Sequence, residues 1–152
     1  MSQKLTRAQE RIMLEQATIL DKNVMRVLRV AEKVDKNNPQ IGWLRKEVDM
    51  GSRADPMFIM NKIKSKIFDF SEHIYAKNEA FFTENNGFIN EKYVKNDARR
   101  EFMVGFIQMI QKNISKVPAN QKEQVWGYLI ELTDAIFKYR DADPDDTFIL
   151  QN

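Results

Sequence analysis

The sequence contains no cysteine and only one histidine, His73, among its 152 residues. Without cysteine there is no disulfide, no thiolate nucleophile and no cysteine-ligated zinc or iron–sulfur site. One histidine leaves almost no acid–base group that works near neutral pH and almost no imidazole ligand for a metal. These shortages exclude most catalytic-triad and metalloenzyme chemistries. We therefore expect a protein that is not an enzyme and that needs no cofactor.

Long apolar runs are also missing. No stretch approaches the roughly 18 uninterrupted apolar residues of a transmembrane helix. Residues 1–7 are mostly polar and hold no apolar core of signal-peptide length. The sequence therefore predicts no transmembrane segment and an intracellular, by default cytoplasmic, location.

Breaking residues divide the sequence into five helical segments. They are predicted over 6–37, 39–49, 56–82, 96–117 and 121–140, separated by Asn-Pro, Asp-Pro and Asn-Gly pairs and by Pro118. Residues 50–54 are expected to form a loop, and Asn120 with Glu123 to cap the last helix. We expect an all-α fold, a four- to five-helix bundle with a long N-terminal helix. It should form one domain over 1–152, with flexible or loosely packed tails at 1–5 and 141–152.

The first predicted helix carries the most regular pattern in the sequence. Apolar residues recur at alternating spacings of three and four, which is the a/d pattern of a coiled coil. We call these residues the heptad seam: Met13, Ala17, Leu20, Val24, Val27, Ala31 and Val34. A helix over 6–37 would be about 45 Å long, and the other predicted helices are too short to cover it without leaving one end exposed. We expect the seam to contact a protein partner or a second copy of the chain, most simply in a homodimer; an ordinary core helix is the alternative.

Basic residues suggest a second function. The net charge is only +2, but residues 1–117 hold 21 Lys and Arg against 15 Asp and Glu. Cations gather on the first helix and near the start of the fourth, where the candidates for binding a phosphate backbone are Lys92, Lys95, Arg99 and Arg100. Acidic residues lie between them, so a solvated face of mixed charge is the other interpretation. Association with nucleic acid is the alternative function.

Two polar patterns in the sequence resemble chemical sites. Asp141, Asp143 and Asp145 match the first three ligand positions of a calcium-binding EF-hand loop, but Asp146 stands where that loop needs glycine. The sequence therefore favours a solvated acidic linker and no metal site. His73 lies four residues after Asp69, which would pair imidazole with carboxylate on one helix face, yet no nucleophile motif accompanies them.

Two glycines inside predicted helices also need a reason. Gly105 and Gly127 each cost a helix up to about 1 kcal/mol relative to alanine. We expect close contact with a neighbouring helix at both positions.

Residues 122–129, KEQVWGYL, follow an aromatic-rich segment with Asn and Lys from Phe81 to Tyr93. This C-terminal third of the chain resembles small helical proteins encoded by large nucleocytoplasmic DNA viruses, in which a Trp-x-Tyr-Leu helix follows a Ser- or Asn-rich turn. Many of those proteins have no assigned activity. The resemblance thus implies a viral origin and, with it, a location in the host cell or the virion. It implies no mechanism. The overall expectation is a helical interaction or structural protein that acts through self-association or protein partners.

Overall fold

A computed structural model describes residues 5–84 and 98–145. Helices account for 85% of the described chain, and no strand occurs in these two ranges. The helices are α1 (Arg7–Val34), α2 (Pro39–Ala54), α3 (Phe58–Asp69), α4 (Ser71–Tyr75), α5 (Glu79–Glu84), α6 (Ala98–Asn113) and α7 (Ala119–Ala142), with a 3₁₀ turn at Ile114–Lys116 after α6. The predicted all-α fold with a long first helix is confirmed.

Helix α1 begins where the sequence predicts. The Thr6 hydroxyl accepts a hydrogen bond from the Gln9 backbone, and the Gln9 side chain accepts one from the Thr6 backbone. Together the two bonds form a capping box, which satisfies amides that the first turn leaves without partners. The helix ends at Val34, and a short turn leads to Asn38 and Pro39, which start α2 as predicted.

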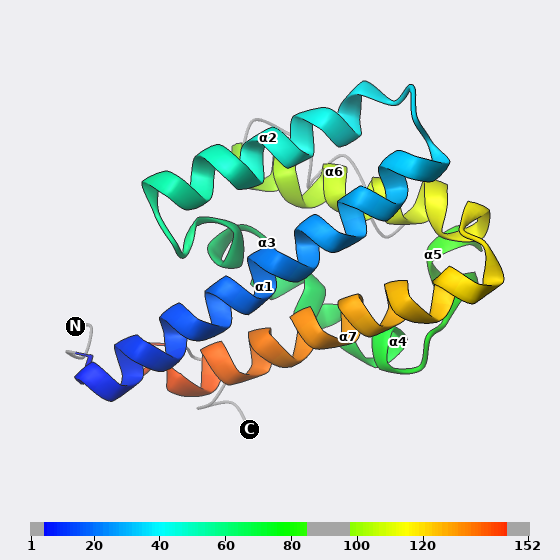
Figure 1. The fold of residues 1–152 in the computed structure, drawn as a ribbon. Helices are drawn as coiled ribbons and strands as arrows, with labels where there is room; N and C mark the ends of the chain where they lie inside the picture. The colour runs from blue at the N-terminus through cyan, green and yellow to red at the C-terminus, as the bar shows by residue number, and fades with distance from the viewer. Residues whose placement is uncertain (1–4, 85–97, 146–152) are drawn as a thin grey trace.

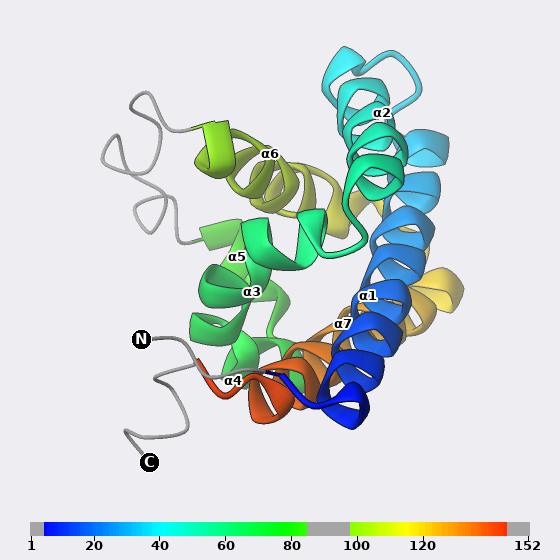
Figure 2. The same ribbon diagram turned by 90° about the vertical axis from the view of Figure 1, so that its left-hand side faces the viewer.

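The helices pack in three groups around one core (Figures 1 and 2). Helices α1 and α7 lie side by side along most of their lengths, and α2 and α6 cross next to each other above them. Helices α3, α4 and α5 close the remaining side, with α3 touching α1, α2, α6 and α7. The centre holds large side chains without solvent contact, among them Phe106, Leu20, Leu44 and Ile63.

The heptad seam belongs to this core. Met13, Ala17, Leu20, Val24, Val27 and Ala31 are at most 7% exposed, and Val34 is partly buried against the core. The expectation that the chain's own helices would leave part of the seam uncovered is wrong. Helix α7 has 24 residues and runs along α1, so an intramolecular partner of nearly matching length was present in the sequence.

The predicted third helix, 56–82, is three helices. A break at Phe70 separates α3 from α4, and Lys77, with a φ of 53°, ends the turn after α4. The break turns the chain so that Phe70 packs edge-on against both Phe81 and Phe82, at centroid distances of 5.6 and 6.3 Å. No glycine or proline lies at this break in the sequence. The break coincides with the aromatic contacts of Phe70, which form only in the folded chain.

Other predicted boundaries also shift. Helix α2 continues through the predicted loop at 50–54 to Ala54. It can do so because Gly51 has no side chain: a Cβ there would lie 2.1 Å from Cδ1 of Phe58 on α3. Helix α7 begins after Pro118 without a side-chain cap, so the predicted cap at Asn120 is wrong.

The predicted tails are partly structured. Leu5 packs against the core, and α7 runs on to Ala142, which is buried. Residues 1–4 and 146–152 of the predicted tails lie outside the described residues. Among the helices of the described ranges, none is long and apolar enough to cross a membrane.

Candidate functional site

Helices α1 and α2 form an antiparallel hairpin whose arms diverge away from the connecting turn (Figure 1). Between them lie two hollows of about 540 and 390 Å³, which share Met25 and Asp49 as lining residues. We call this surface the α1–α2 groove and define it by Lys22, Met25 and Arg29 of α1 and Gly42, Lys46 and Asp49 of α2. The volume of each hollow falls in the range of ligand-binding clefts, which is roughly 300–1,000 Å³.

Two polar contacts join the walls of the groove. The Ser52 hydroxyl donates a hydrogen bond to Oδ2 of Asp21 at 2.8 Å. Nearer the connecting turn, the Arg45 guanidinium donates to Oε2 of Glu32 at 2.5 Å. These contacts join α1 to α2 at two points along the groove.

Asp21 has the most unusual environment in the groove. Burial raises the pKa of its carboxyl group to about 6, and the hydrogen bond from Ser52 only partly offsets that effect. Oδ1 of Asp21 is buried without a hydrogen-bond partner among the described residues. The Ser52 hydroxyl donates a hydrogen bond to a carboxylate, as a base-activated nucleophile would, but no imidazole is among the residues that line either hollow. The geometry therefore fits a hydrogen bond that joins α1 to α2 better than a nucleophile activated by a base.

The upper walls of the groove are basic. Lys22, Arg29 and Lys46 are exposed, and none of them makes a hydrogen bond or ion pair to any residue in the described ranges. The other cations are engaged: Arg53 pairs with Asp49 at 3.3 Å, and Arg26 pairs with Glu131 of α7 at 3.6 Å. The larger hollow also has an apolar part, since the half-buried Met25 and the buried Val48 are among its lining residues.

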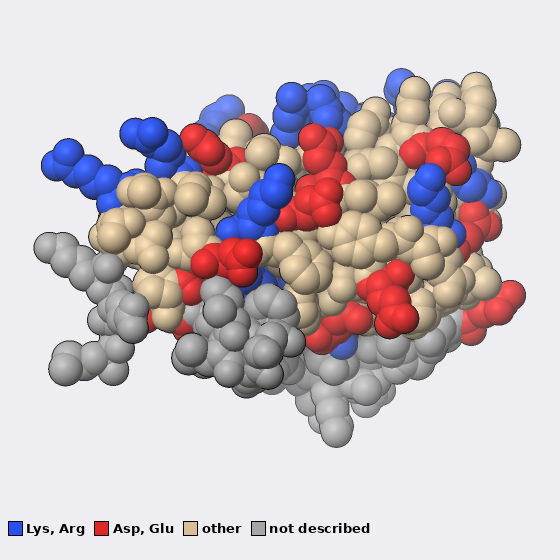
Figure 3. Space-filling view, turned by 90° about the horizontal axis from the view of Figure 1, so that it is seen from below, with Lys and Arg blue, Asp and Glu red and all other residues tan. Residues whose placement is uncertain are grey.

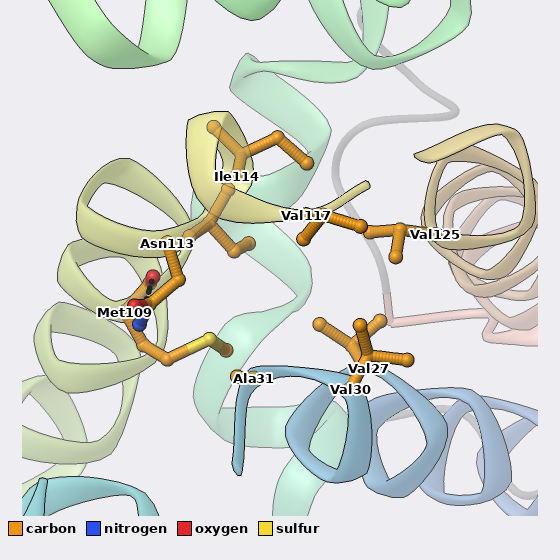
Figure 4. Close-up of a pocket in the computed structure, with 9 residues that line it drawn as sticks. Val27, Val30, Ala31, Met109, Asn113, Ile114, Val117 and Val125 are labelled. Carbon is orange, nitrogen blue, oxygen red and sulfur yellow. Dashed lines mark hydrogen bonds between the residues drawn. The ribbon is translucent and has the colours of Figure 1, made fainter. Parts of the chain in front are cut away.

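Another cavity lies where α1, α6 and α7 meet (Figure 4). Figure 4 shows Val27, Val30, Met109, Val117 and Val125 converging on it, while the Asn113 side chain donates a hydrogen bond to the Met109 carbonyl at 3.1 Å. The cavity measures about 20 Å³, which is room for about one water molecule. It is a packing defect of the core and too small for an organic ligand.

The side chains of all four predicted nucleic-acid residues lie outside the described part of the chain. Lys92 and Lys95 lie outside the described residues; Arg99 and Arg100 belong to the first turn of α6, and their side chains lie outside the described part. On the face that includes α7, Lys and Arg alternate with Asp and Glu (Figure 3). The alternative between a phosphate-binding face and a solvated face at 92–100 stays a prediction.

The calcium candidates of the described chain do not converge on a metal site. Asp141 belongs to the last turn of α7, and Oδ1 of Asp143 accepts a hydrogen bond from the Asp145 backbone at 3.0 Å. No group of three or more acidic or histidine side chains within the described ranges is arranged to hold a metal ion.

The predicted pairing of His73 with Asp69 is wrong because the helix breaks at Phe70 between them. The His73 ring instead stacks on Phe81 with centroids 3.7 Å apart, and Asn78 approaches its Nδ1 at 3.3 Å. His73 therefore holds a turn in place.

The expected close contact of the helical glycines is half right. A Cβ on Gly105 would lie 3.3 Å from Cδ2 of Leu44, so α6 packs tightly on α2 there. A Cβ on Gly127 would meet nothing within 4 Å, and the same is true at Gly42 in the groove. Gly42 thus widens the groove, a feature that the sequence analysis did not identify.

Comparison of the chain with models of known protein families, with curated proteins and with solved structures finds no match.

Proposed function

We propose that this chain is a non-enzymatic interaction protein that binds a protein partner in the α1–α2 groove. The observation that carries the proposal is a cleft between two helices that are joined by two polar contacts. Its lining combines apolar side chains with three exposed cations that have no partner among the described residues. Protein interfaces commonly combine an apolar centre with a charged rim. Of the surfaces described, this groove has both.

The groove replaces the heptad seam as the proposed interface. Leu20 and Val24 have no exposed area, so a dimer built on the seam would first have to separate α7 from α1. That separation would expose the largest helix–helix contact of the core. A homodimer, if the chain forms one, is therefore proposed to use a different face.

Nucleic acid is the other class of partner that exposed cations attract. Asp49 and Asp21 line the same hollow as Lys22 and Arg29, and their carboxylates would oppose a continuous row of phosphates. A protein segment can place its charges one by one, which suits such a mixed groove. The viral origin and the intracellular location remain part of the proposal on the strength of the sequence.

Co-purification with a blocked groove tests this function. A tryptophan at Gly42 would fill the groove at a position with open space around it, and Gly127→Trp is the matched control on α7. We expect the same partner proteins to be recovered with the unmodified chain and with Gly127→Trp, and to be lost with Gly42→Trp. Equal recovery with all three chains, or recovery that nuclease treatment abolishes, would contradict the proposal.

A further inference from the structure

The α1–α2 groove also indicates what kind of segment would occupy it, an inference that rests on the proposed function. Both walls are α-helices, whose backbone amides and carbonyls are already hydrogen-bonded within each helix. They offer no free edge to which an extended peptide could add as a strand. A segment buried against them must satisfy its own backbone hydrogen bonds, and a helix does so.

The wall charges repeat at a helical period. Lys22 and Arg29 are seven residues apart on α1, and Lys46 and Arg53 are seven apart on α2. Seven residues of α-helix advance about 10.5 Å, so each pair lies on one face with its charges two turns apart. A helix packed along the groove meets this spacing with side chains that are also seven residues apart.

The unpaired charges that line the groove are positive, because its acidic side chains already have partners. Asp49 is engaged by Arg53, Glu32 by Arg45, and Asp21 by Ser52. The exposed Lys22, Arg29 and Lys46 keep no counter-charge among the described residues. Between the charged walls, Met25 offers a flexible apolar surface of the kind found in adaptable helix-binding grooves.

We infer that the α1–α2 groove binds an acidic amphipathic helix of a partner protein. The helix would present two carboxylates seven residues apart to Lys22 and Arg29, and apolar side chains between them to Met25. This arrangement pairs Lys22 and Arg29, while Lys46 on the opposite wall adds positive charge that favours an acidic segment. The two polar contacts between α1 and α2 stay intact.

The probe is a fluorescein-labelled, alanine-based helical peptide of about 18 residues, with two glutamates seven residues apart and two leucines between them. Its first control peptide carries glutamines in place of the glutamates, and its second carries lysines. Fluorescence anisotropy with the full chain should give the acidic peptide at least about fivefold tighter binding than the glutamine peptide, as expected for two exposed charge pairs.

Charge reversal provides the decisive comparison. In Lys22→Glu/Arg29→Glu the preference should invert towards the lysine peptide, whereas Arg11→Glu/Lys138→Glu should keep the original preference. Both double variants change the net charge equally, and all four residues are exposed. Inversion in both variants would mean that bulk charge, and not the groove, selects the peptide, and would overturn the inference.

The failures of the inference and of the proposed function are distinguishable. Equal binding of the acidic and glutamine peptides, both weakened by Gly42→Trp, would overturn the acidic selectivity and leave the groove as a binding site. No binding of any peptide would also overturn the inference, and co-purification would still decide the function. Displacement of the acidic peptide by a DNA or RNA oligonucleotide at a lower concentration would overturn it in favour of nucleic acid.

Discussion

The Ser52 hydroxyl on α2 donates a hydrogen bond to Oδ2 of Asp21 on α1 at 2.8 Å, while Oδ1 of the same carboxyl group is buried and has no hydrogen-bond partner among the described residues. One half of the carboxyl group therefore joins two helices, and the other half has lost its hydration without a replacement. A buried polar atom in this state costs free energy. The raised pKa of Asp21 is the consequence.

The first prediction is a pH dependence of stability that belongs to Asp21. Its pKa is about 6 in the folded chain against 3.8 for a free aspartate. The folded chain thus holds the proton more tightly than the unfolded chain, so this group stabilises the fold most below about pH 4 and progressively less as the pH rises through 6. The side chain of Asn in Asp21→Asn stays uncharged at every pH. The melting temperature of this variant minus that of the unmodified chain should therefore increase as the pH rises from about 4 to about 8.

Circular dichroism melts of both chains across that range provide the measurement. Asp35 contributes a pH dependence of opposite sign, since hydrogen bonding from Asn38 lowers its pKa and protonation would remove that stabilisation. Because Asp35 is present in both chains, the difference between their melting temperatures isolates Asp21. A difference that stays constant with pH would refute the assignment.

The second prediction concerns the heptad seam. Leu20→Glu should abolish folding, since it would place an unpaired charge where the native side chain has no exposed area. Leu20→Ala should lower the free energy of unfolding by about 2–5 kcal/mol. Leu14→Glu on the same helix, at a side chain that is 45% exposed, should fold normally. Far-UV circular dichroism and urea titration distinguish these outcomes.

A well-folded monomeric Leu20→Glu variant, obtained from a dimeric parent, would contradict the intramolecular seam. That result is the one expected of an intermolecular interface, so the substitution separates the two uses of the same residues. Light scattering after size-exclusion chromatography gives the oligomeric state of each chain.

The third prediction concerns the approach of α2 to α3. Gly51→Ala should lower the free energy of unfolding by about 1–3 kcal/mol, because its Cβ would overlap the Phe58 ring. Gly127→Ala has open space and should raise stability by up to about 1 kcal/mol through helix propensity. Urea titration of both variants is the test. A stabilised Gly51→Ala chain would show that α2 does not pack on Phe58 in this way.

The sequence predicts those parts of the fold that depend on local chemistry. The capping box at Thr6, the Asn38-Pro39 start of α2 and the buried stripe of α1 all follow from neighbouring residues and a 3.6-residue period. The break at Phe70 does not follow, because it depends on packing against Phe81 and Phe82, and no local residue signals it.

The sequence alone does not predict the α1–α2 groove. Lys22 and Arg29 are among the cations that the sequence places on the first helix, but the groove depends on how α2 lies relative to α1, which no local pattern predicts. Gly42 adds open space to its smaller hollow. The spacing of the heptad seam predicts its apolar character but not that it is covered within the chain. Its covering depends on which helices become neighbours, and hydrophobic periodicity within one helix carries no information on that choice.

Photo-crosslinking from inside the groove tests the central claim most directly. Replacing Gly42 by p-benzoylphenylalanine puts a reactive ketone in the groove, and the same replacement at Gly127 is the control on α7. In an extract of cells that naturally express the chain, irradiation should give defined protein adducts from position 42 and not from position 127. Matching adducts from both positions, or nucleic-acid adducts from position 42, would contradict a protein-binding groove between α1 and α2.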